Sequence, residues 1–371
     1  MNVPLLDLVA QYQSIKEAVL PAMMAVIDRQ SFIMGPEVGQ LETAVARLCE
    51  APYGIACASG TDALLLPLKA LDLKPGDEVI APAFTFFATA GAIHNAGGKP
   101  VFVDIEADSF NVSPEAIAAA ITPRTRAIVV VHLFGQMAAM ERILPIARKH
   151  GLTVIEDGAQ AIGARRKIGG TWRAACGLGN VGTLSFFPSK NLGAWGDGGM
   201  MITGDEPTAA RLKRLRLHGG AKEYHHDEVG TNSRLDTLQA AILLAKLPYL
   251  SGWSAGRRAR AARYSAAFKG HAVVRPPITD PDNEHIFHQY TLRVPNRDGL
   301  GAHLKSKGIG SKVYYPIALH LQPCFADLGY RRGSLPVTER AMDEVISLPI
   351  YPELTDAQQD TVIDAVKGFY P

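Results

Sequence analysis

A lysine and an aspartate in this 371-residue chain stand where they could do chemistry together. Lys190 ends the run Ser-Phe-Phe-Pro-Ser-Lys, and Asp157 ends the run Val-Ile-Glu-Asp, so both follow apolar segments typical of strands. A lysine amine can form an imine with an aldehyde cofactor, and a carboxylate can hold that cofactor's ring nitrogen protonated. Either residue alone would more often be a solvated side chain. Together they indicate pyridoxal phosphate (PLP) chemistry.

Three further segments carry groups that such a cofactor needs. Residues 59–64 stand where a strand turns into a helix, so their backbone amides could bind a phosphate, although an ordinary helix start is the commoner explanation. Aromatic residues crowd positions 84–87, after another predicted strand, where one of them could stack on a flat ring or belong to the core. Gln160 follows Asp157 on the same strand-end loop, close enough for its amide to reach a ring oxygen. The prediction depends on the combination of these segments.

Two other motifs carry no chemistry in our interpretation. Residues 177–182 match the dinucleotide fingerprint Gly-x-Gly-x-x-Gly, which requires a strand before it and a helix after it. Residues 171–176 are not convincingly a strand, and residues 183–187 are typical of one, so we attribute the match to chance. Residues 225–227, His-His-Asp, lie on a polar loop where adjacent side chains cannot easily converge on one metal ion. We predict no metal site.

The elements that must position these residues alternate between short β-branched runs and helical patterns, from residue 53 to about residue 217. This alternation predicts an α/β fold with a mainly parallel sheet covered by helices on both faces. The seven expected strands span residues 54–58, 78–81, 100–104, 127–132, 153–157, 182–187 and 199–203. The helices expected between most of them span residues 61–70, 85–95, 114–121, 140–150 and 208–217.

The chain is longer than a single core usually supports, so we expect two domains. Residues 1–249, with an N-terminal arm, form the expected large α/β domain, and residues 250–371 form a smaller α+β domain. The boundary follows a helical pattern over residues 236–247, which Pro248 would stop. In the smaller domain we expect strands over residues 289–294 and in the 310s, and a closing helix over residues 356–369.

The composition restricts the partners of the chain. Its net charge of +2, with 47% hydrophobic and 20% charged residues, is typical of a soluble globular protein and gives no reason to expect a nucleic acid or a membrane surface as partner. A small molecule is the expected ligand. The four cysteines include no Cys-x-x-Cys pair and the N-terminal residues lack a secretion signal, so we expect a reducing, cytoplasmic location.

Taken together, the motifs resemble the DegT/DnrJ/StrS sugar aminotransferases, a PLP-dependent family of fold type I. The resemblance covers nearly the whole chain, in the family's order and spacing, through residues 60–64 (GTDAL), 84–86 (FTF), 156–160 (EDGAQ), 185–190 (SFFPSK), 196–199 (GDGG), 232–236 (NSRLD), 314–317 (YYPI) and 347–349 (SLP). Each segment is weak evidence alone, but the combination is hard to obtain by chance.

The resemblance implies one set of PLP contacts from within the chain: Gly60, Thr61, Phe86, Asp157, Gln160, Ser185 and Lys190. In the family's pattern Lys190 is the imine lysine, Asp157 partners the ring nitrogen, and Gln160 contacts the ring hydroxyl. Phe86 stacks on the ring, and the remaining three residues bind the phosphate. Asn232 matches a phosphate ligand that the family takes from the neighbouring subunit, which implies a homodimer with two shared active sites.

The resemblance also implies the reaction, in which an amino group passes from glutamate to a ketone on a nucleotide-linked sugar. The branch that acts on UDP-linked 3-keto N-acetylhexosamines or their uronic acids is the most similar one at residues 218–219, 224–226, 232–238 and 314–316. Arg234 offers a planar donor fork for a diphosphate or a carboxylate, and Tyr315 and His320 could bond to sugar or phosphate oxygens. Alternatively, Arg234 pairs with Asp236 or Glu228, and Tyr315 packs at the domain junction.

Other functions within the family stay open. Aminotransferases of 4-keto sugars, including dTDP- and GDP-linked ones, share the same PLP motifs, so these motifs do not decide the position of the ketone. A PLP-dependent sugar dehydratase is disfavoured, because that branch has histidine at the lysine position, where this chain has Lys190. A non-catalytic sensor or scaffold is also disfavoured, because it would have no chemical need for Lys190, Asp157, Gln160 and Ser185 together.

Overall fold

A seven-stranded sheet forms the centre of the larger part of the molecule. The computed structural model describes residues 2–220, 222 and 224–370. The strand order is β1-β9-β8-β5-β4-β2-β3. The strands are β1 (Tyr53–Cys57), β2 (Glu78–Pro82), β3 (Lys99–Val103), β4 (Thr125–Val131), β5 (Thr153–Asp157), β8 (Val181–Ser185) and β9 (Gly199–Thr203). Only β9 runs antiparallel to its neighbours in this sheet, so the prediction of a mostly parallel sheet is confirmed.

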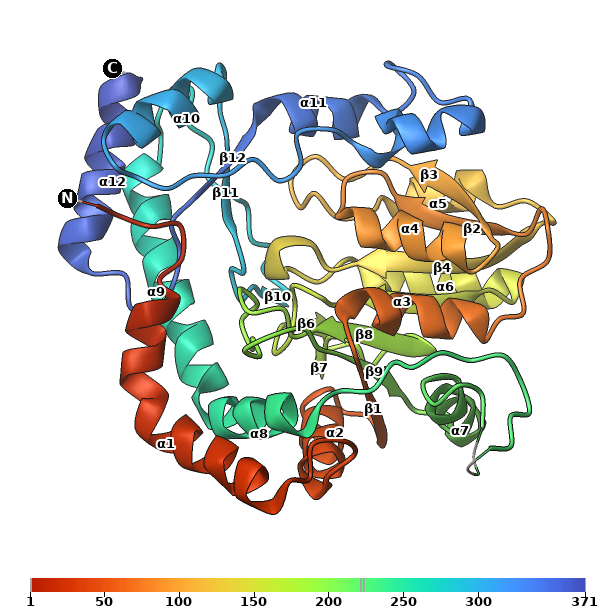
Figure 1. Cartoon of the computed structure of the whole chain (residues 1–371). Helices are drawn as coiled ribbons and strands as arrows, with labels where there is room; N and C mark the ends of the chain where they lie inside the picture. Colours follow the sequence, from red (N-terminus) through yellow and green to blue (C-terminus); the bar gives the residue numbers. More distant parts are fainter. Residues whose placement is uncertain (1, 221, 223, 371) are drawn as a thin grey trace.

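Helices cover both faces of this sheet (Figure 1). They are α2 (Pro36–Leu48), α3 (Gly60–Lys69), α4 (Phe87–Asn95), α5 (Pro114–Ala120), α6 (Met140–His150), α7 (Glu206–Leu215) and α8 (Thr237–Lys246). Neighbouring residues of one strand enter different apolar clusters, since Val130 packs with α5 and α6 on one face, whereas Val129 packs with α3 and α4 on the other. This alternation follows from the pleat of a strand, and burial on both faces explains why the strands are so rich in valine and isoleucine.

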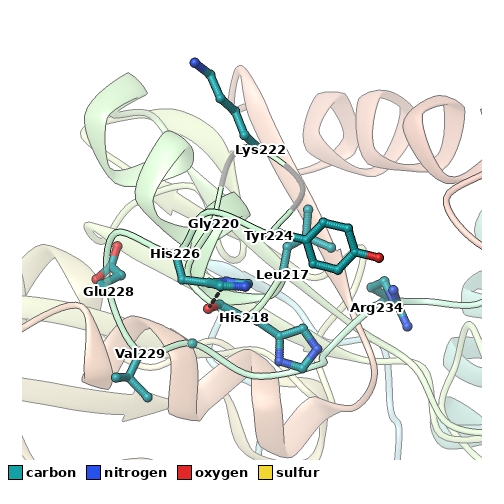
Figure 2. A pocket seen from close by; sticks show the side chains of 10 residues that line it. Leu217, His218, Gly220, Lys222, Tyr224, His226, Glu228, Val229 and Arg234 are labelled. Carbon is teal, nitrogen blue, oxygen red and sulfur yellow. Dashed lines mark hydrogen bonds between the residues drawn. The ribbon is translucent and has the colours of Figure 1, made fainter.

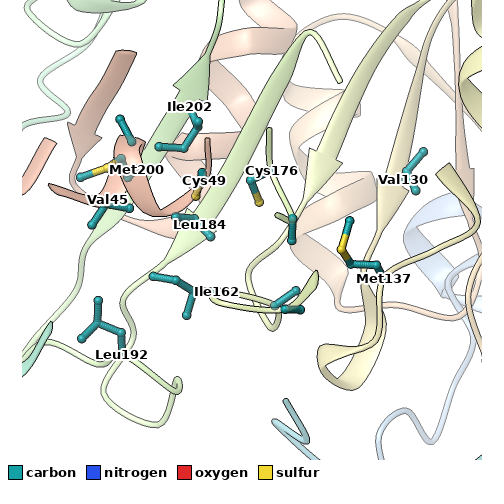
Figure 3. Packing of buried hydrophobic residues seen from close by; sticks show 14 of the residues in the cluster. Val45, Cys49, Val130, Met137, Ile162, Cys176, Leu184, Leu192, Met200 and Ile202 are labelled. Carbon is teal, nitrogen blue, oxygen red and sulfur yellow. The ribbon is translucent and has the colours of Figure 1, made fainter. Parts of the chain in front are cut away.

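The larger of these clusters lies between the sheet and α2, α6 and α8. Figure 3 shows part of it, in which Val45 of α2 belongs to the same cluster as Leu184 of β8 and Ile202 of β9. All three side chains are buried. The cluster therefore fixes the strands whose ends carry Asp157 and Ser185, and it leaves the ends themselves free to form a site.

The C-terminal part of the chain builds a second apolar cluster. Its helices are α9 (Leu250–Phe268), α10 (Arg297–Ser306), α11 (Pro336–Glu344) and α12 (Asp356–Phe369), and β11 (Tyr290–Arg293) pairs antiparallel with β12 (Val345–Leu348). Val3, near the N-terminus, also joins this cluster through a bridge to Ile309. Both chain ends accordingly lie on the same side of the molecule (Figure 1). The domain boundary at residue 250, where α9 begins, stays a prediction.

Several local elements differ from the sequence analysis, which also predicted no helix at α2, α10 or α11. No helix was predicted for α1 (Leu8–Arg29), which packs along α8. The 310s form no strand among the described residues, because Lys312 makes only an isolated bridge to Ser347. A small sheet is formed by β6 (Arg165–Ile168), β7 (Thr171–Ala174) and β10 (Asn283–Glu284), so the prediction that residues 171–176 are not strand was wrong.

The glycine-rich loop that follows β7 nevertheless has no dinucleotide-binding geometry, because the next element is strand β8 and not a helix. The backbone N–H groups of Leu178 and Gly179 instead donate to the buried carboxylate of Glu156, at 2.8 and 2.6 Å. The loop therefore binds an internal anion. In the described part of the chain, no helix has both the length and the apolar character needed to cross a membrane.

Candidate active site

A cavity of about 470 Å³ lies at the carboxyl ends of the parallel strands, where ligands bind in open α/β sheets. Strands β4, β5 and β8 end at its wall, and α3 begins there. Eight residues singled out in the sequence line this one cavity: Gly60, Thr61, Phe86, Asp157, Gln160, Ser185, Lys190 and Tyr315. The fold thus brings together residues that are far apart in the sequence, since Gly60 and Tyr315 are separated by 255 positions.

The carboxylate of Asp157 is buried at the end of β5, with 5% of the residue exposed. Its Oδ2 accepts a hydrogen bond from the Thr89 hydroxyl at 2.9 Å, and its Oδ1 accepts one from the Ala159 N–H at 3.2 Å. Burial raises the pKa of Asp157 above its usual value, although these donors and the charge of Lys190 oppose that shift. The carboxylate is therefore fixed in position and would gain from a further cationic donor.

Lys190 follows β8 in a turn closed by its own N–H, which donates to the Phe187 carbonyl at 2.8 Å. Burial lowers the pKa of its amine to about 8, and the nearby charge of Asp157 limits the shift. A lysine amine with a lowered pKa is neutral more often near pH 7 and is a better nucleophile. The site therefore contains an activated amine and a fixed carboxylate in one cavity.

The start of α3 provides donors for an anion. The Ser59 hydroxyl caps the helix by accepting from the Asp62 N–H at 3.1 Å, while Gly60 and Thr61 face the cavity with Ser185. A Cβ atom at Gly60 would lie only 2.6 Å from the Cβ of Ser185, so glycine is required for this close approach. Free backbone N–H groups and the positive end of the helix dipole favour a phosphate at such a place.

Aromatic rings and an amide also line the cavity. The Gln160 side chain donates to the Tyr315 hydroxyl at 3.0 Å and accepts from the Phe134 N–H at 2.7 Å, so its amide cannot turn freely. The Tyr315 ring also packs on Phe84 and lies 6.4 Å from the exposed ring of Phe86. Burial raises the pKa of Tyr315, which keeps its hydroxyl protonated and able to donate.

Sequence reasoning missed four polar residues of this site: Thr89, His288, Gln289 and Lys312. The His288 ring is buried, its Nδ1 bonds to the Asn191 side chain at 2.9 Å, and burial keeps its pKa well below the usual value, so it is neutral. No local pattern identifies these residues. His288 and Lys312 reach the cavity only because the C-terminal part of the chain folds back onto the sheet.

Asn232 and Arg234 lie outside this cavity. Together with Gly196 and Asp197 they line a separate hollow of about 360 Å³. Arg234 also borders a wide hollow of about 860 Å³ on the loop that follows α7, where Figure 2 shows Tyr224, His218 and Arg234 around one space. Asp197 borders both the smaller hollow and the Lys190 cavity, so these two spaces adjoin.

Arg234 makes no ion pair with the residues that the structure describes. Glu228, one of its expected alternative partners, pairs instead with Arg211 at 2.9 Å and Arg214 at 3.6 Å. The guanidinium of Arg234 is partly exposed at the edge of the two hollows. Its five donors are therefore available to a ligand or to another chain.

His320 does not reach the cavity, contrary to the expectation that it contacts the substrate. Its ring is buried, with 1% of the residue exposed, and its Nε2 bonds to the Glu339 carboxylate at 3.1 Å. The same carboxylate accepts from the backbone N–H groups of Gly333 at 2.7 Å and Leu335 at 3.2 Å. His320 thus belongs to a network that holds the segment before α11.

Comparisons with known proteins agree with this geometry. The sequence matches the DegT/DnrJ/EryC1/StrS aminotransferase family over residues 13–367. It is 50% identical to a protein of Geobacillus stearothermophilus named pleiotropic regulatory protein, over 100% of this chain and 99% of that protein. It is 45% identical to a UDP-N-acetyl-3-dehydro-alpha-D-glucosamine 3-aminotransferase of Acidithiobacillus ferrooxidans, over 96% of this chain and 95% of that enzyme.

Solved structures show the same likeness. The crystal structure of DesV from S. venezuelae, in complex with a ketimine intermediate, superposes with a TM-score of 0.96 at 41% identity. The match covers 99% of this chain and 98% of DesV. The predicted fold type I architecture is therefore confirmed at the level of the whole chain.

Proposed function

The chain belongs to the DegT/DnrJ/EryC1/StrS aminotransferase family, and from this premise we propose that it transfers an amino group from glutamate to a UDP-linked 3-keto N-acetylhexosamine or its uronic acid. The enzyme is a PLP-dependent sugar aminotransferase. The observation that carries the proposal is the placement of Lys190 and Asp157 in one cavity, with a helix start beside them. Such a set has a use in PLP chemistry and none in a merely structural role.

The residues of the cavity fit the cofactor in three places. Asp157 is a buried carboxylate to which no cation donates a hydrogen bond among the described residues, which suits a protonated ring nitrogen. Gly60 lies at the cavity wall where α3 begins, and the positive end of the helix dipole there suits a phosphate. Phe86 presents an exposed ring to the cavity, which suits stacking. We assign these three residues, with Thr61, Gln160 and Ser185, to the cofactor.

The chain's own residues then account for the proton movements. When bound, PLP supplies a reactive aldehyde and an electron-poor ring. Asp157 stabilises positive charge on the ring nitrogen, and the Thr89 hydroxyl holds the carboxylate in place. The Lys190 amine, with a pKa of about 8, can accept a proton from one carbon and return it to another near neutral pH. His288 stays neutral and so adds no competing charge beside the amine.

We also propose a homodimer in which each active site takes residues from both subunits. Asn232 and Arg234 are supported as the shared residues because they are exposed or half-exposed and line a hollow that adjoins the Lys190 cavity of their own chain without lining that cavity. A twofold dimer repeats each such contact in both sites. Mixing an inactive Lys190→Ala protein with an inactive Asn232→Ala/Arg234→Ala protein should restore partial activity after subunit exchange. No recovery in verified mixed dimers would contradict the shared site.

The position of the ketone is tested with defined substrates. The protein is incubated with glutamate and either a UDP-3-keto or a UDP-4-keto N-acetylhexosamine, and the new amine is located by NMR. We expect a 3-amino product. Turnover of the 4-keto compound alone would overturn the 3-keto assignment and favour the alternative, a 4-keto sugar linked to UDP, dTDP or GDP, while the aminotransferase assignment would stand.

The relative from Geobacillus stearothermophilus is named a regulatory protein, and this name suggests a second candidate function, a regulatory role without catalysis. Lys190 and Asp157 argue against it here, because Asp157 is buried and Lys190 is half-buried in the cavity, at a cost that a scaffold need not meet. A visible absorption spectrum of the purified protein gives a direct test, since a catalytic member should be yellow.

We also propose a cytoplasmic location for the protein. Small-molecule substrates and three buried free cysteines are consistent with this proposal.

A further inference from the structure

Lys312 is a cation at the wall of the Lys190 cavity with no assigned role. Its backbone is fixed by two hydrogen bonds with Ser347 of β12, from the Lys312 N–H at 3.2 Å and from the Ser347 N–H at 2.8 Å. Its ammonium lies 5.9 Å from the centre of the Tyr314 ring, and Tyr314 lines the same cavity. The base of the side chain is therefore fixed, and the ammonium is held beside the cavity by a cation–π contact.

The charged side chains that line the cavity are few: Asp157, Lys190, Asp197 and Lys312. Asp157 is buried, Lys190 is half-buried, and both are assigned to the cofactor. No ion pair joins Lys312 to either aspartate or to any other carboxylate among the described residues. Lys312 is thus the uncommitted cation that this chain itself contributes to the cavity wall.

The substrates of the proposed function carry several anionic groups. Glutamate has two carboxylates, a nucleotide sugar has a diphosphate, and a uronic acid adds a sugar carboxylate. An anionic oxygen group that leaves water needs a compensating cation or hydrogen bonds, because an unpaired buried charge is costly. Asp157 and Asp197 carry the wrong charge for this and Lys190 is assigned to the cofactor, so Lys312 is the cavity-lining side chain that can compensate such a group.

We propose that Lys312 binds an anionic oxygen group of the substrate at the cavity wall and so selects for charged substrates. The proposal rests on the proposed function and extends it with a specificity residue. A solvated lysine that binds no ligand would differ from this in a measurable way. A solvated lysine leaves every affinity unchanged when it is replaced, whereas a binding lysine changes only the affinities of ligands that carry the recognised group.

The experiment measures binding of unreactive ligands to the PLP-loaded enzyme by calorimetry, in the wild type, Lys312→Met and Lys312→Arg. The probes are UDP-N-acetylglucosamine, its uronic acid, and the pair glutarate and butyrate, which differ by one carboxylate. Lys305→Met, which removes an exposed charge from α10, is the matched control. We expect Lys312→Met to weaken at least one charged probe about tenfold, Lys312→Arg to retain most of the affinity, and the control to change nothing.

The pattern identifies the group that Lys312 binds. A loss confined to the uronic acid assigns the sugar carboxylate, an equal loss for both UDP-sugars assigns the diphosphate, and a loss for glutarate but not butyrate assigns the side-chain carboxylate of the donor. Equal affinities of wild type and Lys312→Met for all four probes would overturn the inference. A wild type that binds the probes but turns over no ketosugar would instead contradict the proposed function, so the two failures are distinguishable.

Discussion

Glu156 and Asp157 are neighbours at the end of β5, and both are buried. Their surroundings nevertheless shift the pKa values of the two carboxylates in opposite directions. On the Glu156 side, burial opposes the charge, but the His132 ring at 2.8 Å and the backbone N–H groups of the glycine-rich loop outweigh it, and the pKa is lowered. On the Asp157 side, two donors are too few to offset burial, and the pKa is raised.

The difference separates a structural carboxylate from a functional one. A buried charge whose acceptor atoms are all satisfied fastens elements together, and here it ties β4, β5 and the loop before β8. A buried charge that is left short of donors and faces a cavity can bind a cation that arrives later. The four predictions below test this contrast, beginning with the largest expected effect.

The largest effect is expected for Lys190→Ala on the cavity side. The change removes the amine that moves the proton, and a positioned acid–base group contributes about 10²- to 10⁴-fold to a rate, so turnover should fall at least about a thousandfold. The measurement is transfer of the amine from glutamate to the ketosugar under single-turnover conditions. Urea unfolding of the same variant serves as the control for folding. Turnover within tenfold of the wild type would remove Lys190 from the proton path.

The next largest effect is a difference in stability between two isosteric variants at adjacent positions. Glu156→Gln removes the charge from a buried hydrogen-bonded pair with His132, which should destabilise the cofactor-free protein by about 3–5 kcal/mol. Asp157→Asn removes a charge that burial disfavours, so the same protein should be unchanged or stabilised at pH 7. Urea midpoints at equal slopes measure both. If the two variants lost equal amounts of unfolding free energy, the opposite pKa shifts of the two carboxylates would not correspond to different contributions to stability.

Several elements of this contrast were predictable from the sequence. The strand Thr153–Asp157 and the closing helix Asp356–Phe369 have the predicted bounds, because the first is a short β-branched run and the second begins with a Thr355 capping box. Parallel strands end at one edge of a sheet, so residues at several strand ends had to meet. That rule alone brings Asp157 near Lys190.

The rest depends on contacts between distant segments, which local patterns do not encode. His288 and Lys312 enter the cavity because the C-terminal part folds over the strand ends, and nothing adjacent to them signals it. The donors to Glu156 come from a loop whose sequence resembles a dinucleotide fingerprint. His320 was predicted to contact substrate because its type suits that role, and only its burial against Glu339 shows otherwise.

A smaller effect is expected from the pH dependence of stability on the Lys190 side. Folding lowers the pKa of Lys190 from 10.5 to about 8, which corresponds to about 3 kcal/mol of instability at pH 7. Because the unfolded chain binds this proton more tightly, stability of the cofactor-free protein should rise with pH between about 8 and 10.5. Lys190→Met should therefore be more stable than the wild type below pH 8, and the gap should close toward pH 10.5. Lys305→Met is the control, since its charge is exposed, and a gap that does not depend on pH would contradict the prediction.

The smallest effect is expected for Thr89→Val, which keeps the shape of the side chain and removes the hydroxyl that donates to Asp157. The carboxylate then has one donor fewer, so its pKa should rise further and its hold on a protonated ring nitrogen should weaken. A hydrogen bond to a charged group contributes about 1.5–3 kcal/mol at most, and Thr85 lies 3.2 Å from Thr89 and could replace part of it, so cofactor affinity should fall about threefold to tenfold. Fluorescence titration of the cofactor-free protein with PLP measures this affinity.

Thr203→Val is the matched control for Thr89→Val, because Thr203 is buried at the end of β9 and donates to the Asn180 carbonyl at 2.8 Å, outside the cavity. If both variants lost PLP affinity equally, the loss would result from lower stability of the sheet as a whole, and Asp157 would not need the Thr89 hydroxyl to bind the cofactor.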